Sequence, residues 1–317
     1  MYLKSIFSTV LLCLSANSYS HTVPASPPVK SMAETLEAFN WSFDDVDIKT
    51  EQVSDGFYVL FGLGGNIAVS SGKDGVLIVD DQFPELMPKL RNAMRKQGDD
   101  EVDFVVNTHW HFDHADGNKA LGKDSWIVSH SNSRRMMLRD NVINLVGVAG
   151  LQKAYPEEAL PDITYDERMQ FHINGEQVDL LHAGPAHTTG DTAVIFRGRN
   201  AVHMGDVYNN AGYPFIDAGN GGTLDGVITF CKAVLEEIDD DTTVIPGHGP
   251  LATKAQLAAY VLMLETVHAE MLTMIKQGKT FDEISAAGLT ATWDTALGNP
   301  GMFLNRSYIS LTNRYIE

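Results

Sequence analysis

Thr108-His109-Trp110-His111-Phe112-Asp113-His114 is the stretch that decides the fold of this chain, because it places four metal-binding side chains within six residues. It follows a short apolar run, residues 102–106, of a kind that is typical of a buried strand. Imidazoles and carboxylates that leave the ends of several strands can converge on one point. The cluster therefore predicts a metal centre built at strand ends.

Three further ligand-type residues, His187, Asp206 and His248, stand in glycine-containing segments just past apolar runs. A lone histidine after a strand is more often a hydrogen-bonded loop residue than a ligand. Seven such residues at four strand exits are hard to assemble by accident, so we interpret all of them as ligands. The other histidines considered do not belong to such a motif. We interpret them as structural or supporting residues: His130, His172, His182, His203 and His268.

The spacing of the cluster points to more than one ion. If the chain stays extended after the strand, His109, His111 and Asp113 project to one side with period two, while a turn at Asp113 directs His114 elsewhere. Imidazole and carboxylate ligands suit zinc, and two ions about 3.5–4 Å apart can hold a water between them. A zinc-bound water loses its proton near pH ~7, which predicts a metal-bound hydroxide as nucleophile.

The combined motifs resemble the metallo-β-lactamase superfamily of hydrolases, from about Asp55 to about Leu264. The resemblance implies an α/β (α+β) fold, the four-layer αββα sandwich, with the site along the edge where the two sheets meet. It also implies two zinc ions (Zn2+) per chain. Their ligands would be His109, His111 and His187 for one ion, Asp113, His114 and His248 for the other, with Asp206 between them.

Asp206 narrows the class of hydrolase. The well-known metallo-β-lactamases usually have cysteine or serine at this position, whereas the Gly-Asp pair here is similar to glyoxalase-II-like and lactonase-like hydrolases. A bridging carboxylate adds negative charge between two cations and balances the paired site. This departure argues against efficient antibiotic hydrolysis without excluding it.

The N-terminus predicts export. A short positive start (Met1–Lys4), an apolar stretch (Ser5–Ala16) and small residues around position 20 fit a signal peptide, residues 1–20, cleaved before His21. The alternative is a buried N-terminal helix. The residue before Cys13 is a leucine, which argues against a lipoprotein membrane anchor. We therefore expect a periplasmic or secreted protein.

Pattern and composition predict one large domain after a short arm. Prolines suggest an arm with little fixed structure at residues 21–45, and residues 46–317 form a single domain with helices expected at Pro84–Lys96 and Lys254–Lys276. The formal net charge of −18 disfavours nucleic acid as a partner. Cys231 repeats with apolar residues at helical spacing, so we expect it to be a buried core residue outside any disulfide.

Supporting and substrate-contacting residues are harder to assign. Asp80-Asp81-Gln82 either steadies a ligand imidazole or forms a helix-capping turn, and Asp191 is either a supporting or a plain turn residue. Tyr208 follows Asp206 closely, so Tyr208, Asn209 or Tyr213 could donate to a developing oxyanion. Residues 141–151 read as an apolar lid or as a helix packed on the sandwich, and we favour the helix.

Taken together, the residues predict an exported di-zinc hydrolase of a small-molecule ester, lactone, thioester or amide. Asp113 would orient the nucleophile and carry its proton, and Tyr208 would stabilise the oxyanion. Within this class we favour a lactonase or a β-lactamase-like amidase. A glyoxalase-II-like thioesterase is less expected, because its thiol-bound substrate is scarce outside the cytoplasm. The alternatives are an iron-binding member acting on sulfur compounds or oxygen, and a non-catalytic periplasmic metal-binding protein. Residue patterns alone do not choose the substrate or the oligomeric state.

Overall fold

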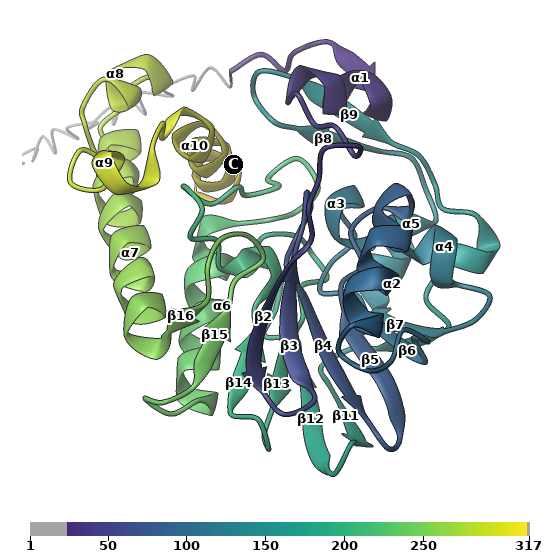
Figure 1. Cartoon of the computed structure of the whole chain (residues 1–317). Coiled ribbons are helices and arrows are strands. Elements are labelled where there is room, and N and C mark those ends of the chain that lie inside the picture. The colour runs from purple at the N-terminus through teal and green to yellow at the C-terminus, as the bar shows by residue number, and fades with distance from the viewer. Residues whose placement is uncertain (1–23, 316–317) are drawn as a thin grey trace, which may run out of the picture.

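Two β-sheets packed face to face form the centre of the protein, and a computed structural model describes them within residues 24–315 (Figure 1). The predicted signal peptide lies outside the described residues. The first sheet contains, in spatial order, β10 (Ile163–Tyr165), β7 (Trp126–His130), β6 (Phe104–Val106), β5 (Gly75–Val79), β4 (Ile67–Gly72), β3 (Phe57–Phe61) and β2 (Lys49–Ser54). The second contains β11 (Arg168–Ile173), β12 (Glu176–Leu181), β13 (Ala193–Phe196), β14 (Ala201–His203), β15 (Thr243–Ile245) and β16 (Ala252–Thr253).

Central strands such as β3, β5 and β13 are apolar on both faces because both faces are covered. Along β3, Phe57 and Val59 point into the space between the sheets, whereas Tyr58 and Leu60 belong to the core on the outer side. Phe57 meets Phe196 of the opposite sheet with ring centroids 4.6 Å apart. Successive side chains of a strand alternate between faces, so one strand contributes to two cores at once.

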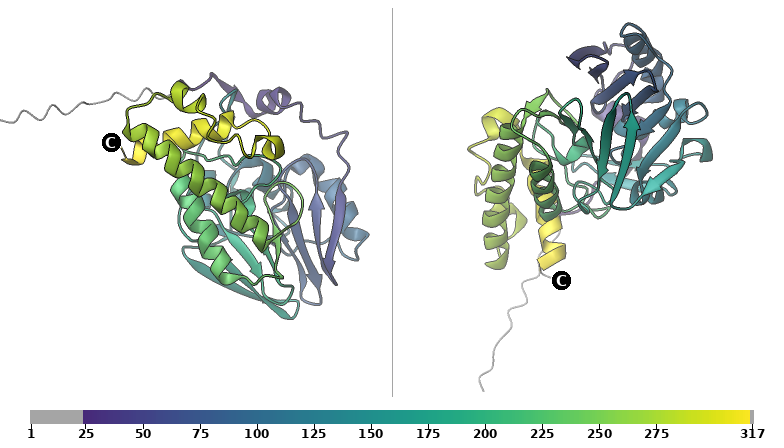
Figure 2. Two further views of the ribbon diagram at one scale, coloured as in Figure 1. Left: turned by 90° about the vertical axis from the view of Figure 1, so that its left-hand side faces the viewer. Right: turned by 90° about the horizontal axis from the view of Figure 1, so that it is seen from below.

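Helices close both outer faces, and Figure 2 shows the sheets lying between them. The shorter helical segments are α2 (Met87–Arg95), α3 (Phe112–Ala115), α4 (Asn118–Leu121), α5 (Ser131–Met137), α8 (Phe281–Ser285) and α9 (Asp294–Leu297), with 3-10 turns η1 (Pro84–Leu86), η2 (Glu157–Ala159) and η3 (Gly205–Val207). The long helices α6 (Leu224–Glu237), α7 (Lys254–Lys276) and α10 (Gly301–Tyr315) cover the second sheet. The predicted four-layer αββα sandwich is confirmed.

The two helices that periodicity predicted are present. The first is divided into η1 and α2, and α7 has the predicted bounds, with Thr253 and Gln256 forming a capping box at its start. Cys231 is fully buried in the core beneath α6, as expected.

A third, small sheet overturns two predictions. It joins β1 (Val29–Ser31), β9 (Ala149–Gln152) and β8 (Asn141–Asn144), and α1 (Met32–Ala38) follows β1 directly. The expectation of little fixed structure in the arm is therefore wrong for residues 29–38, and the helix favoured for residues 141–151 is a β-hairpin. β1 pairs in parallel with β9, about 120 positions away in the sequence, and local patterns do not reveal such a contact.

His130 caps helix α5 with its ring. Its Nδ1 accepts a hydrogen bond from the Asn132 backbone N–H (3.1 Å), its Nε2 donates to the Asp166 carbonyl oxygen (2.7 Å), and its ring stacks on His182. Burial, together with the neighbouring His182, lowers the pKa of His130 to about 4. Protonation at Nδ1 would remove the acceptor that caps the helix.

We expect His130→Asn to reduce the loss of stability in acid. Asparagine keeps an oxygen for the cap but does not titrate. An unfolded histidine takes up a proton below about pH 6.5, whereas folded His130 does so only near pH 4. The unfolded state therefore binds more protons between these values, and the wild type loses stability as the pH falls through this window. Urea unfolding at pH 7.5 and pH 4.5 should show a smaller drop for the variant; equal drops would contradict the assignment.

Candidate metal centre

All seven predicted ligands meet at one end of the sandwich, near α3 in Figure 1. They come from four segments, and each segment follows a different buried strand: β6, β12, β14 or β15. Three groups have donor atoms that all lie within 4.8 Å of one another: His109, His111 and His187; His109, His114 and Asp206; and Asp113, His114 and His248. The groups share members, so the ligands form two adjacent clusters.

The donor atoms face one another at distances that call for cations between them. His111 Nδ1 lies 2.9 Å from His187 Nε2, and His114 Nε2 lies 3.1 Å from His248 Nε2. His109 Nε2 is buried and has no hydrogen-bond partner among the described residues. Buried polar atoms are normally paired, so converging imidazole nitrogens and carboxylate oxygens fit divalent metal ions with nitrogen and oxygen ligands.

Asp206 lies between the two clusters. Its Oδ1 is 3.1 Å from His114 Nε2 and 3.4 Å from His248 Nε2, whereas its Oδ2 is 3.8 Å from His187 Nε2. The two oxygens of one carboxylate therefore face different sets of imidazoles. This is the arrangement that a bridging ligand requires.

Asp113 does not lie on the same side as His109 and His111, as it would if the chain stayed extended. Helix α3 begins at Phe112, and His111 is its extended N-cap residue, so the turn comes before Asp113. Asp113 therefore joins His114 and His248, and its Oδ2 lies 3.2 Å from His248 Nε2. The period-two projection of Asp113 with His109 and His111 is wrong because the helix starts early.

Hydrogen bonds behind the clusters orient the imidazoles. Asp80 Oδ2 lies 2.7 Å from His114 Nδ1 and accepts from the Thr108 hydroxyl, which in turn lies 3.0 Å from His109 Nδ1. The reading of Asp80 as a supporting carboxylate is thus confirmed, and the turn before η1 has no side-chain cap. Asp191 accepts from the Thr188 backbone N–H and hydroxyl, so it holds the loop that carries His187.

Two supporting groups were not predicted. Asp217 Oδ2 lies 3.1 Å from His111 Nε2, and the Phe215 carbonyl oxygen lies 2.8 Å from His187 Nδ1. These partners fix which nitrogen of each ring faces the cluster. Neither residue belongs to a metal-ligand motif, so no local signal marks them.

Burial and neighbouring charges divide the histidines of the site into two groups with shifted pKa values of opposite direction. Burial lowers the pKa of His109 well below its usual value, and it also lowers the pKa of His187. Burial alone would raise the pKa of Asp206, but the charges of His248 and His114 outweigh it and lower that pKa well below its usual range. His109 and His187 are therefore neutral imidazoles. Despite burial, the carboxylates of Asp206 and Asp113 raise the pKa of His114 well above its usual value and that of His248 to about 9, so these two rings carry protons that a bound cation would replace.

Two glycines let the backbone approach the clusters. A Cβ at Gly65 would collide with the His114 ring, and a Cβ at Gly247 would collide with Asp206 Oδ1. The turn after β3 and the turn before His248 can close on the centre only because these positions lack side chains.

A pocket of about 170 Å³ opens on the centre. His111, Asp113, Asp206 and His248 line it, together with Asn209 and a set of apolar side chains. The Asn209 Oδ1 atom accepts from the Ala211 backbone N–H (2.9 Å), which leaves its Nδ2 group to donate.

The two tyrosines considered as oxyanion donors lie elsewhere. Tyr208 packs edge-on against Tyr260 and lines a separate cavity. The Tyr213 hydroxyl donates to the Thr290 carbonyl oxygen and to Asp294 Oδ1. Of the three candidates, the structure brings Asn209 to the pocket on the metal-binding residues.

Residues 63–251, more than half of the chain, match the sequence model of the metallo-beta-lactamase superfamily. The chain belongs to this superfamily. Among curated relatives, the mitochondrial hydroxyacylglutathione hydrolase of Saccharomyces cerevisiae is 24% identical over 214 residues, which cover 65% of this chain and 65% of that protein. A probable hydroxyacylglutathione hydrolase of Schizosaccharomyces pombe is 25% identical over 58% of this chain and 62% of its own length. The chain thus spans somewhat less than two thirds of these relatives.

Solved structures of superfamily members share the fold. The sec-alkylsulfatase Pisa1 from Pseudomonas sp. superposes with a TM-score of 0.63 at 15% identity, covering 84% of this chain and 50% of that one. A metallo-beta-lactamase from Pontibacter korlensis gives a TM-score of 0.55 at 16% identity, covering 69% of this chain and 99% of that one. Such identities establish the sandwich architecture and leave the substrate to be argued from the site.

We expect Asp217→Ala to weaken metal binding by about 10- to 100-fold, because His111 loses the carboxylate that orients its ring. Asp217→Asn keeps an oxygen acceptor without the charge and should fall between the variant and the wild type. Titration against a chelating dye measures the affinities. Asp240→Ala, at a side chain that is 99% exposed, is the control. Wild-type affinity in folded Asp217→Ala would show that this carboxylate does not support the ligand.

Proposed function

We propose that this protein is an exported di-zinc hydrolase that cleaves an ester, lactone, thioester or amide at its carbonyl carbon. The observation that carries the proposal is the position of Asp206, with one oxygen toward each imidazole cluster. A paired centre with a carboxylate between its halves suits hydrolysis of a polarised carbonyl.

The donor set favours zinc. It consists of imidazoles and carboxylates, without thiolate, and its imidazoles are oriented by hydrogen bonds on their far sides. His109, His111 and His187 would hold one ion, Asp113, His114 and His248 the other, and Asp206 both. Bound there, zinc supplies Lewis acidity toward the carbonyl and makes water more acidic.

Side chains of the pocket supply the remaining steps. Asp113 orients the attacking water and accepts its proton, because its carboxylate is one of the groups that line the pocket. The water oxygen bonds to the carbonyl carbon, the bond to the leaving group breaks, and the leaving atom takes the proton. Asn209 donates from Nδ2 to the carbonyl oxygen as negative charge develops there.

We expect purified mature protein to contain two zinc ions per chain and to lose hydrolysis of a simple lactone or a chromogenic β-lactam on chelation. Elemental analysis measures the first and a steady-state assay the second. Asp206→Ala should lose at least one ion, because the carboxylate that serves both clusters is gone. Two tightly bound zinc ions in Asp206→Ala would refute the bridging role, and iron in place of zinc would favour redox chemistry on sulfur compounds or oxygen.

The same assay separates the oxyanion donors. Asn209→Ala should lower kcat by about 10²-fold or more, the usual cost of removing one such donor. Tyr208→Phe, one position away, serves as its control and should leave kcat unchanged. If the wild-type protein with both zinc ions bound hydrolyses none of the lactone, ester, thioester and lactam substrates, a metal-binding role without catalysis would be supported.

The proposal of export is supported by the N-terminal pattern of a positive start, an apolar stretch and small residues near position 20. We expect the protein expressed in its native host to begin at His21 and to appear outside the cytoplasm. N-terminal sequencing of the exported fraction tests this. Retention of Met1 on exported protein would remove the claim of a cleaved signal peptide.

A further inference from the structure

The pocket over the metal centre has a wall that the superfamily match does not include. The match begins at residue 63, whereas Leu36, Phe39 and Trp41 come from the segment around α1, and Met302 comes from α10. Ile143 and Leu145 of the β8 hairpin complete this side. Segments at both ends of the chain therefore shape the space beside the ligands.

Aromatic rings run along this wall as far as the ligands. The Phe39 and Trp41 ring centroids are 6.2 Å apart, and Trp41 lies 6.4 Å from Phe112, which stands between His111 and Asp113 in the sequence. Across the pocket, the Phe215 ring lies 6.0 Å from His111 and 5.6 Å from His187. An apolar group held between these rings would place its neighbouring atoms at the metal-binding residues.

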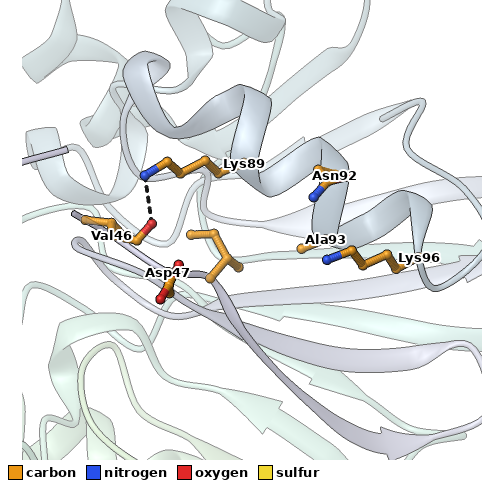
Figure 3. Close-up of a pocket in the computed structure, with 7 residues that line it drawn as sticks. Val46, Asp47, Lys89, Asn92, Ala93 and Lys96 are labelled. Carbon is orange, nitrogen blue, oxygen red and sulfur yellow. Dashed lines mark hydrogen bonds between the residues drawn. The ribbon is translucent and has the colours of Figure 1, made fainter. Parts of the chain in front are cut away.

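The segment that carries this wall is firmly attached to the body of the protein. Its β1 strand pairs with β9, and the Trp41 backbone N–H donates to the Leu36 carbonyl oxygen. Farther along, Lys89 of α2 donates to the carbonyl oxygens of Phe43, Asp44 and Val46, and Figure 3 shows its contact with Val46. These bonds hold Trp41 in place from both sides, so the wall is a built part of the site.

Charge and size define what fits. Among the described residues, no lysine or arginine lines the pocket, and its charged or ionisable groups are members of the metal-binding set. A pocket of about 170 Å³ is close to the size of an apolar cavity of about 150 Å³ that holds benzene. An anionic tail held against the apolar wall would lose its water without gaining a lysine or arginine partner, which is costly.

We propose that the substrate carries an uncharged, apolar group of about the size of a phenyl ring next to its hydrolysed carbonyl, and that Leu36, Phe39 and Trp41 select this group. The inference rests on the proposed hydrolase function and names the substrate class of that site. The proposed substrate differs from the hydroxyacylglutathione that two relatives are named for.

Three trifluoroethyl esters with the same small leaving group test the selection. They are the 3-phenylpropanoate, with an apolar ring, the monoester of glutaric acid, with a carboxylate, and the acetate, with neither. Hydrolysis by metal-loaded protein is followed by fluorine NMR of the released alcohol. We expect kcat/KM for the phenylpropanoate to exceed that for the glutarate by at least tenfold, with the acetate below the phenylpropanoate.

Leu36→Lys introduces a cation into the wall and should reduce the preference for phenylpropanoate over glutarate by at least tenfold. Its matched control is Leu262→Lys, the same change at an exposed leucine of α7 outside the pocket. Phe39→Ala is a second variant at a ring that is 42% exposed, so the fold does not depend on it. It should lower kcat/KM for the phenylpropanoate several-fold more than kcat/KM for the acetate, which has no ring to contact Phe39.

Binding of 3-phenylpropan-1-ol, which has no hydrolysable bond, separates failure of this inference from failure of the hydrolase. Calorimetry on metal-loaded protein should show binding that Leu36→Lys weakens at least fivefold and Leu262→Lys leaves unchanged, with 1-propanol as the ligand that lacks the ring. Binding without turnover of any ester would sink the hydrolase and keep the apolar pocket. Turnover of the acetate with no ring preference and no binding of the alcohol would overturn the inference and keep the hydrolase.

Discussion

The convergence of seven donor groups in a largely buried space is the constraint on which the rest of the structure depends. Imidazole nitrogens such as those of His111 and His187 lie 2.9 Å apart, and buried polar atoms at that separation need a shared proton or cation. The sandwich supplies the rigidity for this, because each ligand follows a buried strand that is packed on both faces. Asp80, Asp217 and the Phe215 carbonyl oxygen then fix the rings.

Different parts of the protein form the candidate metal centre and the wall of the pocket beside it. The two sheets and their turns position the charged groups, and glycines such as Gly65 and Gly247 bring the backbone close to them. The substrate side of the pocket comes instead from α1, the β8 hairpin and α10. Under the proposed function, a metal-bound hydroxide could attack many carbonyl compounds. Selectivity would then depend on these walls, whose surface is largely apolar and uncharged.

Sequence patterns failed where a distant partner decided the local conformation. Residues 141–151 contain enough apolar residues for a packed helix. Instead, they form the β8–β9 hairpin, and β1 pairs with β9. Asp113 would project with His109 if the strand continued, but α3 starts at Phe112 and turns it toward His248. Tyr208 follows Asp206 closely in the sequence, but its ring packs on Tyr260. Burial of an aromatic ring is favourable, and nearness in the sequence to Asp206 does not direct the ring to the pocket.

The sequence by itself determined the family, the sandwich, the candidate ligands and the long helix α7. Each of these leaves a local signature: an H-x-H-x-D-H run, apolar strands before polar turns, or apolar residues at helical spacing. Only the tertiary structure decided how the ligands divide into clusters, which groups orient them and what surrounds the substrate. Asp217 lies 106 positions from His111, and Leu36 and Met302 meet at one pocket. Such contacts arise from packing of distant segments, and no short pattern records them.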